Sequence, residues 1–191
     1  MAELFLILIS TSLVNNLVLD YMLGTDPIIA VTKKSSPAFD MCIVIIITMP
    51  LVAIFSYALN NILIIPLGLE YLQLILMVIL VSIVIQSVNF ITRKYFSVLH
   101  ERISVLIPLI MVNCTVLGMA LLTTRLNFGF VSVLFYGLGS AIGFSLTLMA
   151  ISSIRDKASV SDVPMPFRGV AILMITLGLI SMAFMGFNGI N

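Results

Sequence analysis

The stretch Cys42–Leu59, CIVIIITMPLVAIFSYAL, decides the fold class, because it runs nearly the length of a membrane helix without a charged residue. A helix needs about 20 predominantly apolar residues to cross the hydrocarbon core of a bilayer. A strand of a membrane β-barrel alternates apolar and polar side chains, whereas this stretch is apolar at nearly every position. It therefore predicts a transmembrane α-helix.

The composition of the whole chain agrees with this prediction. Of 191 residues, 61% are hydrophobic and 9% are charged, against about 45–50% and about 25% in an average soluble domain. These proportions exclude a water-soluble globule. The net charge of +1 also excludes the clustered basic surface by which a protein binds nucleic acid.

Five further apolar stretches resemble the first one, and together they predict six transmembrane helices. Bounded by charge, Gly or Pro, the six lie near residues 4–23, 41–60, 70–91, 103–122, 130–152 and 169–188. We therefore expect an all-α integral membrane protein that forms a single six-helix domain over residues 1–191. Pro50 and Pro108 lie inside two of these spans and predict kinks.

The basic residues predict the orientation of this domain. Lys and Arg concentrate in the cytoplasmic loops of membrane proteins. Of the nine here, only Arg125 lies in an even-numbered loop, and the other eight lie in the first, third and fifth loops, as Lys33, Lys34, Arg93, Lys94, Arg102, Arg155, Lys157 and Arg168. The odd loops should therefore be cytoplasmic and both termini outside. The single histidine, His100, falls in the third loop and is interpreted as a solvated residue.

A short internal repeat relates the two halves of the chain. VNNLVL at Val14–Leu19 matches VNCTVL at Val112–Leu117 at four of six positions, 98 residues apart. Three spans per half is an odd number, so the halves would insert upside-down relative to each other. This predicts two inverted three-helix repeats, residues 1–98 and 99–191, an arrangement typical of transporters that bind their substrates on discontinuous helices near the midplane.

Polar residues inside the apolar spans are the candidate ion pathway. Asn15, Asn16 and Asn113 lie deep in the first and fourth spans, where polar groups are costly and tend to be paired or functional. They line an ion site, or they join helices through hydrogen bonds. Asp20 lies four residues after Asn16 and shares its face if the helix is continuous; interfacial solvation or capping is the other interpretation.

The fifth span carries Gly139 and Gly143 in G-x-x-x-G spacing, a pattern that lets two helices approach closely. Packing within the chain, a contact between subunits, or a cofactor lying against the backbone would each explain it. Signals of soluble enzymes are missing, since the sequence has no G-x-G-x-x-G after a strand, no P-loop and no G-x-S-x-G. The two cysteines, Cys42 and Cys114, form no metal-binding pair in sequence, so each is a buried thiol or a cofactor ligand.

Five separated strings carry a resemblance to a known family. They are LVNNLVLDYMLG at 13–24, IPLIMVNCTVLG at 107–118, YGLGSAIGFSL at 136–146, IRDKASVSDVPMPFRG at 154–169 and GLISMAFMGFNG at 178–189. In this order and spacing the chain resembles, end to end, the A-type membrane subunits of Rnf (Rsx) ion-translocating electron-transport complexes. It is similar also to the E-type subunits of sodium-pumping NADH:quinone reductases.

The resemblance implies a multi-pass component of the bacterial inner membrane that relays electrons without being catalytic itself. It implies a homologous sister subunit of opposite topology (E type) and further subunits of the B, C, D and G types. The complex would couple electron transfer between ferredoxin and NAD(H) to the movement of Na⁺ or H⁺. Because the chain lacks the flavin-attachment motif of partner subunits, no covalent flavin is expected on it.

The resemblance also implies metal ligands. In the family, one [2Fe-2S] cluster is held by two cysteines from the A-type chain and two from its sister. Cys114 matches the cysteine of the N-C-x-V-L-G motif, but the other motif, L-G-x-C-P, reads Leu23–Pro27 with Asp26 at the ligand position. A carboxylate could complete the ligand set with an altered potential, and Cys42 is interpreted as a core thiol. Two other functions of the whole chain stay open. It is a non-redox inverted-repeat ion transporter or channel, or it is a structural assembly subunit of a redox complex.

Overall fold

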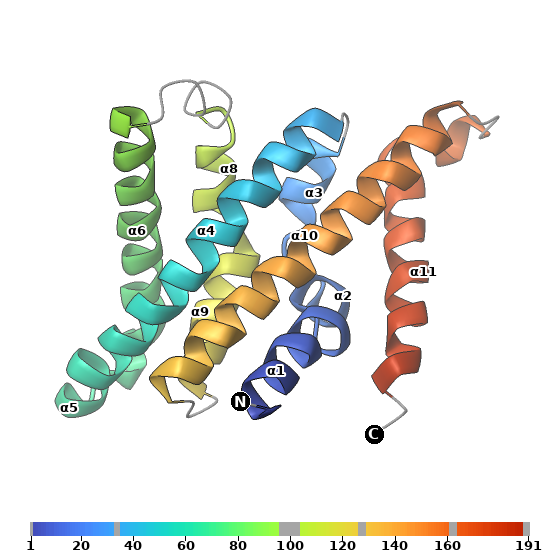
Figure 1. Cartoon of the computed structure of the whole chain (residues 1–191). Coiled ribbons are helices and arrows are strands. Elements are labelled where there is room, and N and C mark those ends of the chain that lie inside the picture. Colours follow the sequence, from blue (N-terminus) through green and yellow to red (C-terminus); the bar gives the residue numbers. More distant parts are fainter. Residues whose placement is uncertain (1, 33–34, 96–103, 126–128, 161–163, 189–191) are drawn as a thin grey trace.

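The computed structural model describes residues 2–32, 35–95, 104–125, 129–160 and 164–188. Within these ranges the chain is all-helical and has no strand. The elements are α1 (Ala2–Ile9), the π-helix η1 (Ser10–Val14), α2 (Leu17–Tyr21), α3 (Thr25–Val31), α4 (Ser35–Leu59), the π-helix η2 (Asn60–Ile64), α5 (Ile65–Leu67), the 3₁₀-helix η3 (Glu70–Leu72), α6 (Gln73–Tyr95), α8 (Ile107–Met111), α9 (Cys114–Arg125), α10 (Phe130–Val160), the 3₁₀-helix η4 (Met165–Phe167) and α11 (Val170–Asn188) (Figure 1).

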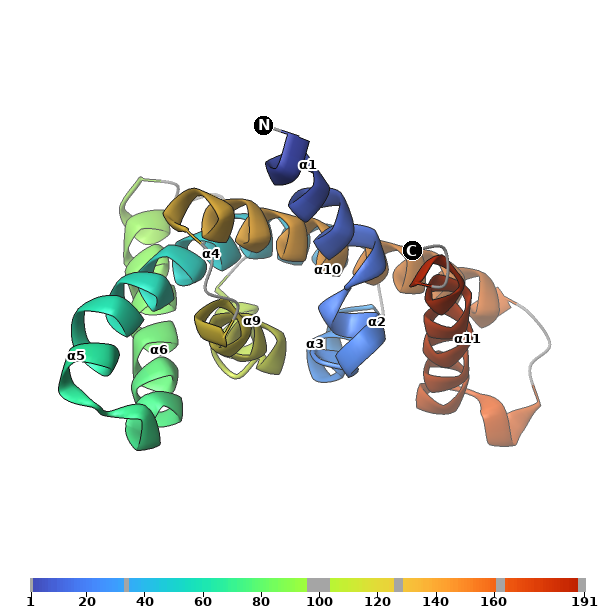
Figure 2. The same cartoon turned by 90° about the horizontal axis from the view of Figure 1, so that it is seen from below.

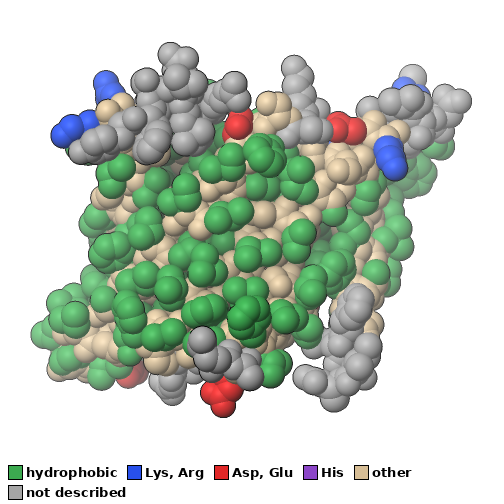
Figure 3. Space-filling model, in the orientation of Figure 1, with side chains coloured by type: hydrophobic (Ala, Val, Ile, Leu, Met, Phe, Trp, Pro, Cys, Tyr) green, Lys and Arg blue, Asp and Glu red, His purple; other side chains and the backbone are tan. Residues whose placement is uncertain are grey.

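Four of the described segments are long and apolar enough to cross a membrane: Ser36–Leu67, Glu70–Lys94, Ile107–Arg125 and Phe130–Lys157. Two shorter apolar helices, Glu3–Val14 and Val170–Gly186, accompany them. The face shown in Figure 3 is apolar over its middle, and charged side chains lie at its upper and lower ends. These features confirm an all-helical, multi-pass membrane protein.

The long helices α4 and α10 pack side by side at the centre of the molecule (Figure 1). At Gly137 of α10, an added Cβ would lie 2.9 Å from the Cβ of Ala53 and 3.0 Å from the Cα of Pro50, so only glycine allows this approach of the two helices. On one face of this pair, α6, α9, α2 with α3, and α11 lie in a row (Figure 2). The core therefore lies between this pair of long helices and a row of shorter ones.

The first predicted span, 4–23, is not one continuous helix. After η1 the helix breaks at Asn15 and Asn16, and Met22 and Gly24 adopt left-handed conformations with φ of 55° and 80°. The predicted loop that follows instead contains α3 and the start of α4. Asparagine side chains offer the backbone hydrogen bonds that compete with those of a helix, which accounts for a break within an apolar run.

The fourth predicted span, 103–122, is also interrupted, between α8 and α9 at residues 112–113. Pro108 lies in the first turn of α8, where its missing N–H costs nothing, so it begins a helix instead of kinking one. Pro50 does lie inside a helix, α4. The helix of the fifth predicted span, α10, extends to Val160, past the predicted end at residue 152. Lys33, Lys34, His100 and Arg102 lie outside the described residues.

Candidate functional site

Asn16 organises the break in the first segment. Its Oδ1 accepts a hydrogen bond from the backbone N–H of Val18 at 3.0 Å, so Asn16 caps α2. Its Nδ2 donates to the carbonyl of Gly143 at 2.9 Å and to Thr147 Oγ1 at 3.0 Å, both on α10. With 2% of its surface exposed, Asn16 both starts a helix and joins it to a second one.

Asn113 does the same capping at the other break. Its Oδ1 accepts from the backbone N–H of Thr115 at 2.9 Å at the start of α9, and it too is 2% exposed. The matching side chain in the first segment is therefore Asn16, although the sequence match pairs Asn113 with Asn15. Unlike Asn16, Asn113 has no hydrogen-bond partner at Nδ2, and the neighbouring Thr115 Oγ1 is also buried without one.

The turn at Gly24 packs directly on this second break. An added Cβ on Gly24 would collide with Thr115 Oγ1 and lie 3.2 Å from Asn113 Oδ1. One turn further along α9, an added Cβ on Gly118 would lie 2.5 Å from Leu23 Cδ1. Residues 23–24 and 113–118 are thus in close contact, and the positive φ of Gly24 also favours glycine there.

This contact brings the two segments that carry Cys114 and Asp26 side by side. Cys114 is half-buried as the first residue of α9, and Asp26 is exposed in the first turn of α3. An anionic group is stabilised at a helix N-terminus such as that of α9. In the described part of the chain, no group of three or more His, Cys, Asp or Glu could hold a metal. Cys114 and Asp26 are two donors, so a [2Fe-2S] cluster at this place would need further ligands from outside the described residues of this chain.

Cys42 is more deeply buried than Cys114 and is therefore less accessible to a metal. It is 5% exposed within the core cluster, and its Sγ lies 3.7 Å from the carbonyl oxygen of Ser145. The expectation of a core thiol is confirmed.

Asp20 does not share a helix face with Asn16, as a continuous helix would have required. Asp20 lies exposed within α2, whereas Asn16 precedes that helix and is buried. The two side chains therefore face different surroundings, and the break in the helix is the reason.

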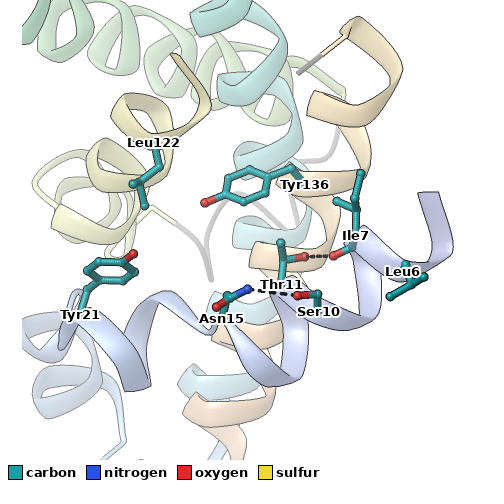
Figure 4. Close-up of a pocket in the computed structure, with 8 residues that line it drawn as sticks. All are labelled: Leu6, Ile7, Ser10, Thr11, Asn15, Tyr21, Leu122 and Tyr136. Atoms are coloured by element: carbon teal, nitrogen blue, oxygen red, sulfur yellow. Dashed lines mark hydrogen bonds between the residues drawn. The ribbon is translucent and has the colours of Figure 1, made fainter. Parts of the chain in front are cut away.

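A half-open hollow of about 440 Å³ lies at the break in the first segment (Figure 4). Asn15 faces it and donates through Nδ2 to Ser10 Oγ at 3.0 Å. Tyr136 of α10 and Tyr21 of α2 face the same hollow, whose full lining is Leu6, Ile7, Ser10, Thr11, Asn15, Tyr21, Leu122 and Tyr136. Sequence patterns do not single out the two tyrosines; their only signal there is a phenol group inside an apolar span.

The glycines of the fifth span serve packing within the chain. An added Cβ on Gly143 would lie 2.8 Å from the carbonyl oxygen of Ser12, and one on Gly139 would collide with Thr11 Oγ1. Both contacts are between α10 and η1. Of the three explanations for the G-x-x-x-G pattern, these contacts favour close packing of two helices of this chain.

Comparisons with known proteins match this chain over its whole length. A family model described as "Rnf-Nqr subunit, membrane protein" covers residues 4–191. The chain is 44% identical to the A-type subunit of the ion-translocating oxidoreductase complex of Thioalkalivibrio sulfidiphilus, over 100% of this chain and 99% of the relative. The corresponding subunits from Colwellia psychrerythraea and Shewanella sp. strain ANA-3 are 40% and 42% identical, over 100% of this chain and 98% and 99% of theirs.

Proposed function

Because the chain belongs to the Rnf-Nqr family, and is a membrane subunit of an Rnf-type ion-translocating complex, we propose that it relays electrons within the membrane. This relay would couple electron transfer between ferredoxin and NAD(H) to the movement of Na⁺ or H⁺. The observation that carries the proposal is the close contact of the Gly24 turn with Asn113 and Thr115. That contact supports the proposal, because the segments that carry Asp26 and Cys114 lie against each other there.

Cys114 and Asp26 are the two proposed ligands from this chain. A [2Fe-2S] cluster, when bound, supplies a one-electron carrier whose potential depends on its ligands and hydrogen bonds. This chain contributes the thiol of Cys114 at the N-terminus of α9 and the carboxylate of Asp26. The homologous sister subunit of opposite topology would contribute the remaining ligands. Subunits of the B, C, D and G types would carry the other cofactors.

We propose six spans in two inverted repeats, residues 1–98 and 99–191, within the bacterial inner membrane. The packing pattern supports this, since α2 packs with α10 and α11 as one group, and α9 packs with α4 and α6 as another. Each group also contains one helix break capped by a buried asparagine. The broken segment of each half thus packs against long helices of the other half.

Both termini are proposed to lie outside the cytoplasm. α1 begins and α11 ends at the same end of the molecule (Figure 1). Arg93 and Lys94 end α6, and Lys157 ends α10, at the opposite end. Basic residues favour the cytoplasmic side, so their position supports this orientation.

The proposed ion pathway begins at the hollow beside Asn15 and includes Asn16, Asp20 and Asn113. The end of η1 leaves backbone carbonyl groups without partners inside the helix. Together with hydroxyl and amide oxygens, such carbonyls are the groups by which transporters coordinate Na⁺ at broken helices. The unpartnered Oγ1 of Thr115 supplies a further buried oxygen at the second break.

The test is the iron signal of the purified complex. We expect Cys114→Ala to remove the intramembrane iron signal in electron paramagnetic resonance and to block electron transfer, because it removes a ligand. Cys42→Ala is the matched control and should leave both nearly intact, since this thiol is buried in the core. Asp26→Cys should keep a cluster with a shifted potential, and Asp26→Ala should lose it.

Two results would contradict the proposal. If both Asp26 variants keep the parental spectrum, Asp26 is not a ligand. If the wild-type complex with all its partners shows no intramembrane iron, the electron relay is wrong, and a non-redox ion transporter or a structural assembly role takes its place.

A further inference from the structure

The short helix α3 connects the Gly24 turn to the rest of the molecule. It has seven residues, Thr25–Val31, and buries Pro27, Ile28 and Val31. A helix of this length is not stable on its own. Its position, and therefore that of Asp26 in its first turn, depends on contacts at its two ends.

Arg155 of α10 supplies the contact at the C-terminal end of α3. Its Nη1 donates to the carbonyl of Ile29 at 3.0 Å and to Thr32 Oγ1 at 2.9 Å. These bonds join residues that are 126 and 123 positions apart in the chain. Thr32 is fully buried, and its hydroxyl donates to the carbonyl of Ile28 at 2.6 Å. A guanidinium thus lies where the last carbonyl groups of α3 lack partners within the helix.

Chemistry favours arginine in this place. The C-terminus of a helix carries a partial negative charge that a cation stabilises. Hydrogen bonds from a charged donor are stronger than those between neutral groups. Arg155 is half-buried, so water competes with these bonds less than it would at an exposed site.

The N-terminal end of α3 is fixed by a different element. There the Gly24 turn lies against Thr115 and Asn113 of the second break. The helix is therefore held between α9 at one end and Arg155 at the other, and a shift at either end moves Asp26.

We propose that Arg155 is a positioning residue, which holds α3 so that the Gly24–Asp26 turn stays against the start of α9. Its consequence for the cluster rests on the proposed function, in which Asp26 is a ligand. Holding α3 in place is separate from the effect of Arg155 on the orientation of the chain in the membrane. Any positively charged residue at this position would have that second effect.

The first test measures the position of α3 without using iron. In the intact complex, Ile28→Cys places a buried thiol on α3, and its rate of labelling by N-ethylmaleimide reports how often the helix opens. The buried Cys42 on α4 is an internal reference. We expect Arg155→Ala to raise labelling at position 28 by about tenfold, as the loss of charged hydrogen bonds implies, and to leave Cys42 unchanged. Arg155→Lys should restore part of the protection.

Matched variants at two positions separate the hydrogen bonds from the charge. Lys157→Ala removes a cation from the same end of α10 and should leave labelling at position 28 unchanged. Thr32→Val removes the hydroxyl that accepts from Arg155, and should raise labelling, whereas Thr32→Ser should not. Equal labelling in Arg155→Ala and Lys157→Ala would overturn the proposal.

The second test reads the cluster. Arg155→Ala should shift the midpoint potential or the line shape of the intramembrane iron signal, and Lys157→Ala should not. Raised labelling with an unchanged iron signal would overturn the link between Arg155 and the ligand turn. Absence of iron from the wild-type complex would instead overturn the proposed function, while the labelling result still decides whether Arg155 holds α3.

Discussion

Tyr136 and Asn15 face one hollow from two segments that are distant in the sequence (Figure 4). Tyr136 is 7% exposed on α10, and Asn15 lies where η1 ends. In a chain with so few polar side chains, this gathering of a phenol, an amide and the hydroxyl of Ser10 provides the most polar of the hollows described. At the residue scale, the proposed ion pathway depends on these groups.

We expect Tyr136→Phe and Asn15→Ala to lower ion uptake by the complex in proteoliposomes severalfold, because each removes an oxygen from the hollow. The iron signal should stay unchanged. Ser87→Ala is the control: Ser87 is the hydroxyl residue in the apolar hollow of about 550 Å³ between α4 and α6. If all three variants transport alike, the hollow beside Asn15 lies outside the ion pathway.

At the element scale, two asparagines start two helices but hold them differently. Asn16 caps α2 and also donates to Gly143 and Thr147 on α10. Asn113 caps α9, and its Nδ2 has no partner. The first break is therefore tied to the centre of the molecule by hydrogen bonds, and the second by the packing of the Gly24 turn.

Asn16→Ala should accordingly destabilise the protein more than Asn113→Ala. Loss of a cap costs about 1 kcal/mol, and each interhelical hydrogen bond in a membrane adds about 0.6 kcal/mol. Asn16→Ala should thus cost about 2 kcal/mol and Asn113→Ala about 1 kcal/mol, measured by denaturant titration in mixed micelles. Asn89→Ala on α6 serves as control, because the buried Oδ1 of Asn89 has no partner. A loss for Asn16→Ala no larger than that for Asn89→Ala would contradict the structure.

At the scale of the whole molecule, the distribution of charge supports the proposed orientation. Arg93 and Lys94 end α6 at one end of the molecule, and Arg125 ends α9 at the other. The apolar middle of the surface (Figure 3) fits the hydrocarbon core between them.

A phosphatase fused after Asn191 should therefore be active, because the C-terminus is expected outside the cytoplasm. The same reporter fused after Lys94 should be inactive, since that end of α6 is expected inside. Fluorescent-protein fusions, which fold only in the cytoplasm in this assay, should give the reverse pattern. An inactive phosphatase after Asn191, with fluorescence at the same position, would show that the orientation is inverted.

The sequence by itself determined the class of this protein. Runs such as Cys42–Leu59 predict membrane helices because hydrophobicity is a local property, summed over neighbouring residues. The five strings carried the family resemblance because a motif is also a local pattern of neighbouring residues. The family match confirms that resemblance. Burial of Cys42 also followed from its apolar neighbours.

Only the tertiary structure decided where the helices break and what meets at the breaks. The first segment breaks at Asn16, whose side chain forms hydrogen bonds with residues of α10 that lie 127 and 131 positions away. The local sequence does not indicate such distant partners. The contact of Gly24 with Thr115, the hollow beside Tyr136 and the bonds from Arg155 to α3 likewise join distant segments. Each depends on the packing of whole helices, and periodicity within one helix does not specify which neighbour it will face.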